Sequence, residues 1–326
     1  MDFIGFDEHR YNYKTLLEFL GQQESQNIAW GDLYTEELLD YFRTGSVLIG
    51  AKLPWPNSHD KIRFRGGEVT IHAGMNGHRK SMVCGQIMQG FALQGEAACV
   101  TSFEMPVRDT QKRMCLQAAG TWNPSPGFIR EWAEWNDQRL AFYNKLDTTP
   151  SSRVLGAAYY AAQELGCKHI LIDSLTKCGL PYGERGAEKN FIDALCATAK
   201  AFDIHIHLVC HVRKPHVGGE ENIPTKFDIR GAGELTDLVH NVIIHWADKK
   251  KASLVRLRDN QRSLSPKELN YIDNRPDQRF IVVKQRNGEY EGTIGLTFGD
   301  GMQFNEGRQL PFSFKQESSQ VAGGTV

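Results

Sequence analysis

Residues 68–82 read EVTIHAGMNGHRKSM, and they constrain the architecture of this chain more than any other segment. A β-branched run, Val69–Ile71, leads through a turn of small residues from Gly74 to Lys80-Ser81, where a helical pattern begins. Small residues let a backbone curl around a phosphate, and a helix N-terminus adds partial positive charge. The layout predicts a phosphate-binding loop, with Lys80 on the β- and γ-phosphates and Ser81 on Mg²⁺. A plain strand–turn–helix is the alternative.

One position of this loop departs from the motif G-x-x-x-x-G-K-[ST], because Arg79 stands where a second glycine is usual. The backbone N–H of Arg79 can still face a phosphate, but its side chain must turn away and its φ must suit a residue with a Cβ. Nucleotide affinity therefore depends on how this side chain is accommodated. The loop residues predicted to contact nucleotide are Gly74, Asn76, Gly77, His78, Arg79, Lys80 and Ser81.

The bulk properties are those of an ordinary globular protein built on one large domain. The chain has 326 residues, of which 40% are hydrophobic and 24% are charged, and its net charge is −1. This balance excludes a global attraction to nucleic acid, so a polyanion-binding surface must be local. Seven scattered cysteines favour free thiols in a reducing compartment. The sequence has neither a membrane-spanning run nor a signal-peptide pattern, so we expect a cytoplasmic protein without membrane association, in the host cytoplasm if phage-encoded.

Apolar strand patterns alternate with helical patterns from residue 68 onward. Strands are predicted at 69–73, 98–103, 140–143, 169–173, 204–210, 242–246, 280–284 and 294–298. Helical patterns at 81–93 and 190–201 lie between some of them. The alternation predicts an α/β fold with a mostly parallel sheet covered by helices on both faces, and ligands at the carboxyl ends of the strands. Asn287-Gly288 predicts that the last two strands form an antiparallel hairpin.

Three segments are expected along the chain: a short helical arm over residues 1–45, the α/β domain over 46–315, and a disordered polar tail over 316–326. The arm has helical patterns at 13–20 and 35–42, and Gly45 would end the second. Since the arm is too short to fold alone, we expect it to pack on another part of the protein. Residues 49–66 are interpreted as loop and turn.

Two carboxylates follow strands that this sheet would bring to one edge. Asp173 ends the strand pattern HILID, where it suits Mg²⁺ ligation beside Ser81. Glu104, in SFEM, would lie across the γ-phosphate from Lys80 and activate an attacking water. Each carboxylate alone is also consistent with an ordinary strand end, and the combination favours the chemical role.

Three histidines alternate along the strand pattern at 204–211. His205, His207 and His211 share one strand face, but the outer two are about 20 Å apart at ~3.3 Å per residue, too far for one metal ion. His211 lies at the carboxyl end, which suits a polar sensor of the γ-phosphate.

Positive charge gathers in three further places. The glycine-rich segment 213–230 predicts a loop that grips a phosphodiester backbone without reading its sequence, with a solvated surface loop as the alternative. Its predicted nucleic-acid contacts are Arg213, Lys214, Lys226, Arg230 and Gly231. Lys284 and Arg286 point the same way from a strand end, which suits donation to a neighbour's nucleotide. Residues 248–262 hold six Lys/Arg against two Asp/Glu, and we interpret them as a loop between strands rather than a nucleic-acid contact.

The blocks GMNGHRKS, SFEM, HILIDSL, LVCHVRKP, DIRGAGEL and VVKQRNGEYEGTIGLTF follow one another in this order. Together they resemble the RecA-like motor domain of DnaB-type hexameric replicative helicases, and most of all the helicase half of phage helicase–primases and of the mitochondrial helicase Twinkle. The resemblance covers about residues 66–298. It implies a RecA-like P-loop core and a ring-shaped homo-oligomer, a hexamer, that uses ATP and Mg²⁺ to translocate on single-stranded DNA and unwind duplex. It also implies a primase or a loader as a further partner.

The same resemblance implies a role for each site residue. It makes Glu104 the catalytic glutamate, Asp173 the metal-binding aspartate, His211 the γ-phosphate sensor, and Arg286 the arginine finger for the adjacent subunit, with Lys284 as its companion. Residues 35–42 would be a linker helix that docks on a neighbouring subunit.

Two features of the chain leave alternatives open. We expect no zinc-binding or primase region before the motor, and an arm shorter than that of bacterial members, so ring assembly is expected to need a partner or DNA. A RecA-like recombination ATPase that forms filaments is one alternative. A non-hydrolysing nucleotide-binding scaffold or loader is the other, and only Arg79 favours it.

Overall fold

A nine-stranded sheet forms the centre of the protein. The structure, a computed structural model, describes residues 7, 10–22, 32, 35–44, 49–180, 185–213, 221–229, 232–308, 310 and 312. Within these ranges the spatial order of the strands is β3-β2-β4-β5-β1-β6-β7-β8-β9. Their bounds are β1 (Val69–Gly74), β2 (Ala98–Ser102), β3 (Leu140–Tyr143), β4 (His169–Asp173), β5 (His205–His211), β6 (Asn241–Ala247), β7 (Gln278–Gln285), β8 (Gly292–Phe298) and β9 (Phe304–Asn305).

The first six strands pair in parallel, and β7, β8 and β9 add antiparallel partners at one side. The predicted α/β class, the mostly parallel sheet and the hairpin at Asn287-Gly288 are therefore confirmed. Every predicted strand is present, with ends that differ by at most two residues. In this order β5 lies between β1 and β4, so the loops after these three strands meet at the carboxyl edge of the sheet.

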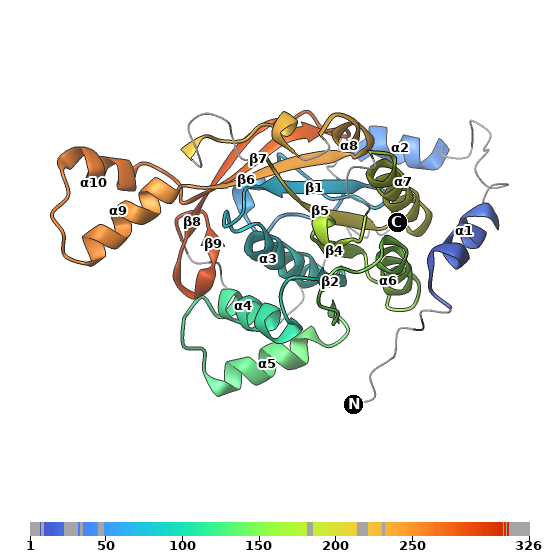
Figure 1. Ribbon diagram of the computed structural model, residues 1–326, viewed down its shortest axis with the longest axis horizontal. Coiled ribbons are helices and arrows are strands. Elements are labelled where there is room, and N and C mark those ends of the chain that lie inside the picture. Colours follow the sequence, from blue (N-terminus) through green and yellow to red (C-terminus); the bar gives the residue numbers. More distant parts are fainter. Residues whose placement is uncertain are drawn as a thin grey trace.

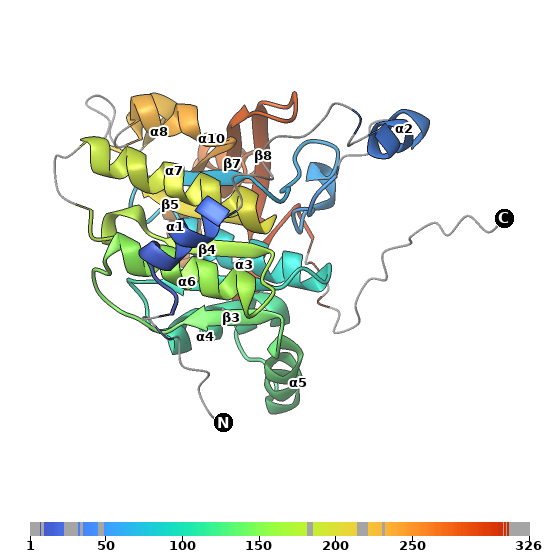
Figure 2. The ribbon, with the colours of Figure 1, turned by 90° about the vertical axis from the view of Figure 1, so that its right-hand side faces the viewer.

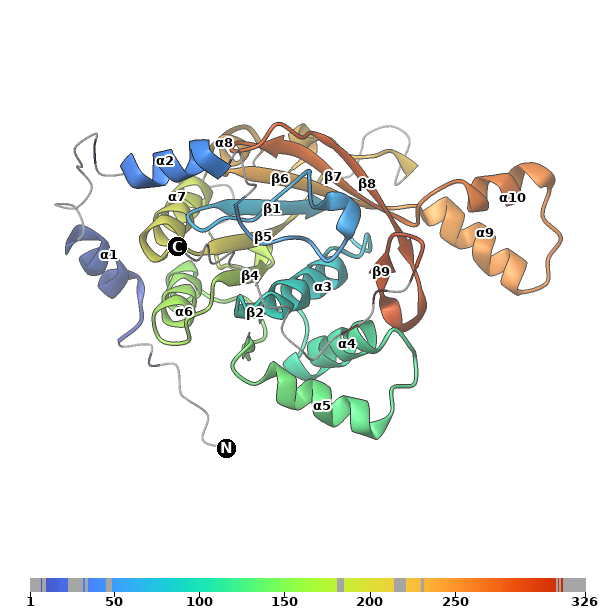
Figure 3. The ribbon, with the colours of Figure 1, turned by 180° about the vertical axis from the view of Figure 1, so that it is seen from behind.

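Helices cover both faces of the sheet (Figures 1 and 3). Their bounds are α1 (Tyr13–Gln22), α2 (Thr35–Thr44), α3 (Lys80–Leu93), α4 (Val107–Ala119), α5 (Pro126–Asn136), α6 (Ser151–Gln163), α7 (Arg185–Phe202), α8 (Ala232–Leu238), α9 (Lys249–Asp259) and α10 (Pro266–Asp273). One buried core joins α1, α6 and α7 to the sheet, and a second joins α3, α4 and α5 to the opposite face. Strand β5 serves both cores, because Ile206 and Leu208 belong to the first and Val209 to the second.

The two helices of the amino-terminal arm behave differently. Helix α1 packs beside α6 and α7, with Leu16 fully buried and the Phe19 ring stacked 4.9 Å from that of Phe202 (Figure 2). Helix α2 stands apart from the body and exposes an apolar stripe that includes Leu38 and Phe42, the latter 78% exposed (Figure 2). Gly45 and the tail 316–326 lie outside the described residues. Among the helices that the structure describes, none is long and apolar enough to cross a membrane.

The interpretation of residues 248–262 as a loop is wrong. They belong to a pair of helices, α9 and α10, that projects from the body between β6 and β7 (Figures 1 and 3). Asp248 caps α9 by accepting from the N–H of Lys251, and Ser265 and Glu268 form a capping box on α10. Lysine, arginine, leucine and alanine are good helix formers, and this propensity outweighs the repulsion within a dense run of cations. We refer to residues 248–277 as the helical arm.

Candidate active site

The segment between β1 and α3 forms a tight loop at the carboxyl edge of the sheet. Lys80 starts α3, and its side chain folds back so that Nζ donates to the carbonyl oxygens of Gly74 at 2.8 Å and Met75 at 3.0 Å. The same nitrogen lies 3.3 Å from Nδ1 of His211. Burial lowers the pKa of Lys80, and the nearby Asp173 carboxylate partly offsets that effect. A buried ammonium held by loop carbonyls is placed to meet a phosphate.

Neighbouring strands fix the backbone of this loop. A Cβ on Gly74 would lie 2.5 Å from the carbonyl oxygen of His245, so only glycine fits there. His78 is fully buried, and its Nδ1 accepts from the N–H of Ala247 at 3.0 Å. Lys249, at the base of the helical arm, donates from Nζ to the carbonyl oxygen of Gly77 at 2.6 Å. The sequence did not predict this last contact, because Lys249 was assigned to a solvated loop.

Arg79 adopts the left-handed backbone conformation that glycine prefers, with φ 62° and ψ 20°. Its guanidinium turns away from Lys80 and lies 4.0 Å from the centroid of the Phe298 ring on β8. Burial lowers its pKa, and the Asp277 carboxylate acts in the opposite direction. Its Nη1 is buried and has no hydrogen-bond partner among the residues that the structure describes. The side chain is thus accommodated outside the phosphate loop.

Ser81 and Asp173 meet beside the loop. The hydroxyl of Ser81 hydrogen-bonds the carboxylate of Asp173, which ends β4 and is only 5% exposed. Burial raises the pKa of Asp173 to about 6; the Glu104 carboxylate adds to the rise, while Ser81 and Lys80 oppose it. A hydroxyl and a carboxylate oxygen are ligands that Mg²⁺ prefers. A cation here would also stabilise the charged carboxylate that burial now disfavours.

Glu104 lies across the site on the segment that follows β2. Its Oε1 accepts from the Ser174 hydroxyl at 3.0 Å and lies 3.9 Å from Nε2 of His211. His211 therefore stands between Lys80 and Glu104, touching Lys80 through Nδ1. The carboxylate remains accessible, with 45% of its side chain exposed. Ser174 was not predicted, although its position directly after Asp173 at the end of a strand was a usable signal.

Comparison with known proteins adds to this geometry. No protein-family model matches the chain, and a search of curated proteins finds no match. Among solved structures, a DnaB-like replicative helicase, described with its interactions with primase, is 14% identical over 90% of this chain and 77% of that chain, with a TM-score of 0.64. A second solved structure, an isolated helicase ATPase domain, is 14% identical over 86% of this chain and 99% of that chain, with a TM-score of 0.66. The chain has the fold of a DnaB-type helicase motor domain. At this identity the similarity establishes the fold alone.

In this DnaB-type fold Lys284 and Arg286 lie far from the phosphate loop of their own chain. Gln285 pairs with Asn241 at the start of β6, so the two cations stand at the amino edge of the parallel strands, roughly 15 Å or more from Gly74 by strand geometry. Lys284 Nζ donates to the carbonyls of Thr236, Asp237 and Val239, and Arg286 donates to that of Asp237. Both side chains therefore bind the C-terminal end of α8.

The predicted nucleic-acid loop is described only in part. Lys214, Arg230 and Gly231 lie outside the described residues. Arg213 is exposed, and its N–H donates to the Asp228 carbonyl at 2.7 Å, which closes the base of the loop. Lys226 lies 5.6 Å from the ring of Phe227, a residue that is 76% exposed. An exposed aromatic ring beside a cation was not predicted from the sequence, where the charges alone had marked this loop.

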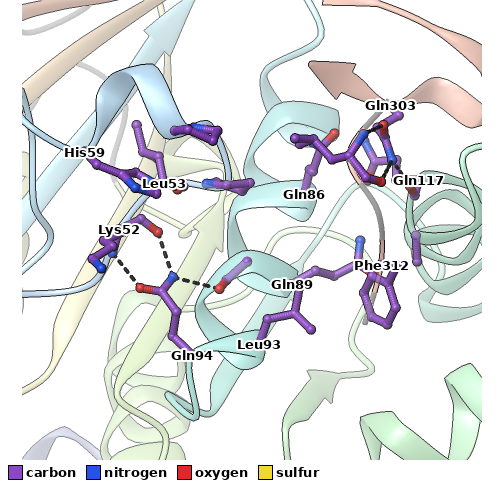
Figure 4. A pocket seen from close by; sticks show the side chains of 15 residues that line it. Lys52, Leu53, His59, Gln86, Gln89, Leu93, Gln94, Gln117, Gln303 and Phe312 are labelled. Carbon is purple, nitrogen blue, oxygen red and sulfur yellow. Dashed lines mark hydrogen bonds between the residues drawn. The ribbon is translucent and has the colours of Figure 1, made fainter. Parts of the chain in front are cut away.

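A cavity of about 310 Å³ lies away from this chemistry (Figure 4). Its lining comes from residues 52–59, the later turns of α3, α4 and the segment after β9. Gln94 spans one wall, where its side chain exchanges hydrogen bonds with the backbone of Lys52 at 2.8 and 2.9 Å (Figure 4). Lys80 stands at the opposite end of α3, so this cavity is separate from the phosphate loop.

Proposed function

We propose that this protein is an ATP-dependent DNA helicase motor that acts as a ring, translocates on single-stranded DNA and unwinds duplex. The observation that supports it most is the meeting of Lys80, His211, Glu104 and the Ser81–Asp173 pair at one edge of a DnaB-type fold. Nucleotide binding alone needs a loop and a lysine. A carboxylate poised across the loop is what hydrolysis adds.

The chain's own residues divide the work at this edge. The Lys80 ammonium leaves the Gly74 and Met75 carbonyls to bind the β- and γ-phosphates. Glu104 orients the attacking water and takes its proton, and the Ser174 hydroxyl holds the carboxylate in position. His211, between Lys80 and Glu104, contacts the γ-phosphate and transmits its loss to β5 and the loop that follows. Phosphate release thereby shifts the segment from Arg213 onward.

Mg²⁺ would be held by the Ser81 hydroxyl and the Asp173 carboxylate, and it would neutralise charge on the phosphates. The hydrogen bond between these two groups supports the assignment, because it keeps both oxygens on the same side of α3. Gly74, Asn76, Gly77, His78 and Arg79 contribute backbone rather than side chains to nucleotide binding; His78 and Arg79 direct their side chains to β6 and β8.

Ring assembly follows from the separation of the two functional edges. Arg286 and Lys284 stand at the amino edge, so they serve as finger and companion only if one subunit's amino edge meets another subunit's carboxyl edge. A head-to-tail contact of this kind generates rings when the rotation closes. The exposed apolar stripe of α2 supports a further contact with a neighbouring subunit. A hexamer, with a primase or loader as partner, is the specific form that we propose.

Single-stranded DNA would contact the loop after β5. Arg213, Lys226 and the outlying Lys214 and Arg230 supply a sequence-independent attraction to phosphates. Phe227, exposed beside Lys226, supplies a surface on which a base can stack.

Two rival functions make different demands on the same residues. A filament-forming recombination ATPase would also use Glu104 and Asp173, and electron microscopy with ATP and single-stranded DNA separates filament from ring. A non-hydrolysing scaffold or loader would need neither carboxylate, and Arg79 no longer favours it, because its side chain packs on Phe298 instead of filling the loop.

An ATPase assay with and without single-stranded DNA tests the proposal. Wild-type protein should hydrolyse ATP, and DNA should stimulate the rate. Lys80→Ala should lose nucleotide binding, whereas Glu104→Gln should bind ATP and lose about 10²–10⁴-fold in turnover. Glu134→Gln, an exposed carboxylate on α5, is the matched control and should be unaffected. Near-normal turnover in Glu104→Gln would remove Glu104 as the base.

A further inference from the structure

Four buried histidines form an unbroken hydrogen-bonded chain across the sheet, on the face that α3 covers. His169 on β4 lies 3.1 Å from His207 on β5, which lies 3.1 Å from His72 on β1, which lies 2.9 Å from His245 on β6. Each of the four is at most 1% exposed. At the surface end, Nε2 of His169 lies 2.7 Å from a carboxylate oxygen of Glu96. The proposed function uses none of these side chains.

The direction of the hydrogen bonds follows from the chemistry of the two ends. A carboxylate only accepts, so His169 donates to Glu96 from Nε2, and each neutral imidazole has one N–H to give. His207 then donates to His169, His72 donates from Nε2 to His207, and His245 donates from Nε2 to Nδ1 of His72. Nδ1 of His245 is left buried without a hydrogen-bond partner in the described part of the chain. The chain thus ends in a ring that the protein leaves incompletely bonded, which is unfavourable in a dry core.

A buried thiol stands at this same end. Cys84 on α3 is fully buried, and its Sγ and one ring nitrogen from each of His72 and His245 all lie within 4.8 Å of one another. Two nitrogen ligands of one tetrahedral ion are about 3.3 Å apart, given bonds of ~2.0–2.1 Å. The 2.9 Å between His72 Nδ1 and His245 Nε2 therefore needs to open by only about half an ångström. Burial lowers the pKa of both imidazoles, for His72 to about 3, so both rings are in the neutral form that binds metals.

We propose that His72, Cys84 and His245 bind one thiophilic transition-metal ion, Zn²⁺ or Cu⁺. Two imidazoles and a thiolate are ligands that these ions select over Mg²⁺ or Ca²⁺. Binding exchanges the Sγ–H proton of Cys84 for the ion and releases that proton to solvent. The ion replaces the His72–His245 hydrogen bond, and the proton of His245 moves from Nε2 to Nδ1. The chain from His72 through His207 and His169 to Glu96 then orients His72 as an outer-shell relay.

The position of the three ligands gives the ion a structural role. His72 lies two residues before Gly74, Cys84 lies four residues after Lys80, and the carbonyl oxygen of His245 faces Gly74. One ion would therefore tie together the strand that enters the phosphate loop, the helix that leaves it and the neighbouring strand. We expect it to stabilise the loop without taking part in hydrolysis.

Metal content of the full-length chain is the direct test. Elemental analysis of protein purified without added chelator should find about one zinc or copper per chain. Protein unfolded with chelator and refolded with Co²⁺ should show the thiolate charge-transfer and tetrahedral bands of a cobalt–cysteine site. Cys84→Ser should lose the charge-transfer band. Cys99→Ser, which removes a buried thiol from the other face of the sheet, should keep it. Separate titrations with Zn²⁺, and with Cu⁺ under anaerobic conditions, decide between the two ions.

Each outcome bears on the proposal. Wild-type protein that refolds fully, by circular dichroism, yet takes up none of the three ions would overturn it and leave a neutral imidazole chain. A charge-transfer band that persists in Cys84→Ser would also overturn it, because the thiolate would lie elsewhere. Chelation should lower the melting temperature of wild-type protein and leave that of Cys84→Ser unchanged, and an equal response of both would contradict the site.

Discussion

Arg79→Gly tests how a phosphate loop accommodates a side chain where glycine is usual. The left-handed backbone at Arg79 costs a residue with a Cβ about 1–2 kcal/mol, which glycine avoids. Glycine loses about 0.4–1 kcal/mol through the greater freedom of the unfolded chain. It also loses the guanidinium–Phe298 contact, worth about 0.5–2 kcal/mol at such a site. These terms nearly cancel, so the free energy of unfolding should stay within about 1 kcal/mol of wild type.

Arg79→Ala is the matched variant, because it loses the same contact but keeps the strained backbone. It should be less stable than Arg79→Gly by about 1 kcal/mol in urea unfolding. A double-mutant cycle with Phe298→Leu should give a coupling of about 0.5–1 kcal/mol for the stacked pair. An alanine variant as stable as the glycine variant would refute the strain argument.

Nucleotide affinity should change little in Arg79→Gly, because the guanidinium points at Phe298 and Lys80 holds the phosphates. Titration with a fluorescent ATP analogue should show a difference of at most about tenfold, or ~1.4 kcal/mol. A wild-type chain that binds no nucleotide, beside an Arg79→Gly variant that does, would mean that the loop is disabled. The scaffold function would then replace the motor.

Three further outcomes are expected. Mixing Arg286→Ala subunits with Lys80→Ala subunits should restore some ATPase activity, since one interface then pairs an intact loop with an intact finger worth roughly 10³–10⁵ in rate; full activity of a dilute monomer would contradict this. Burial raises the pKa of Asp173 from 3.8 to about 6, so the folded chain binds that proton more tightly, and the free energy of unfolding should fall by about 2–3 kcal/mol in all as pH rises through the interval between these two values. Asp173→Asn should remove this slope in magnesium-free urea titrations. Replacing Arg213 and Lys226 by alanine should flatten the dependence of log DNA affinity on log salt and abolish DNA-stimulated ATPase but keep basal ATPase, and an unchanged slope would move the contact to the helical arm.

The elements of the fold were predictable because their patterns are local. Val69–Ile71 and His169–Asp173 are apolar runs of strand length, and Asn287-Gly288 is a strong hairpin signal. The helical arm was missed although Asp248 and the Ser265–Glu268 pair are capping residues visible in the sequence. The order of the strands was beyond local patterns, because it depends on which strands pair across the sheet.

The catalytic edge was predictable for a related reason. Lys80, Asp173 and His211 each end or follow a parallel strand, and parallel strands end at one edge. Which groups touch there depends on β5 lying between β1 and β4, which puts His211 beside both Lys80 and Glu104. The histidine chain escaped for the same reason, since its four members come from four strands whose adjacency no sequence pattern records.

The helical arm is a detachable module in the architecture of the sheet. Ala247 and Gln278, which flank it, are directly paired across β6 and β7, so the chain leaves and re-enters the sheet at neighbouring points. A two-residue turn could close that gap and preserve the register of every strand. Because Lys249 reaches from the arm to Gly77, a fluorescent label on the arm would report on the occupancy of the loop. The insertion thus offers a handle, built into the chain, for reading one subunit at a time.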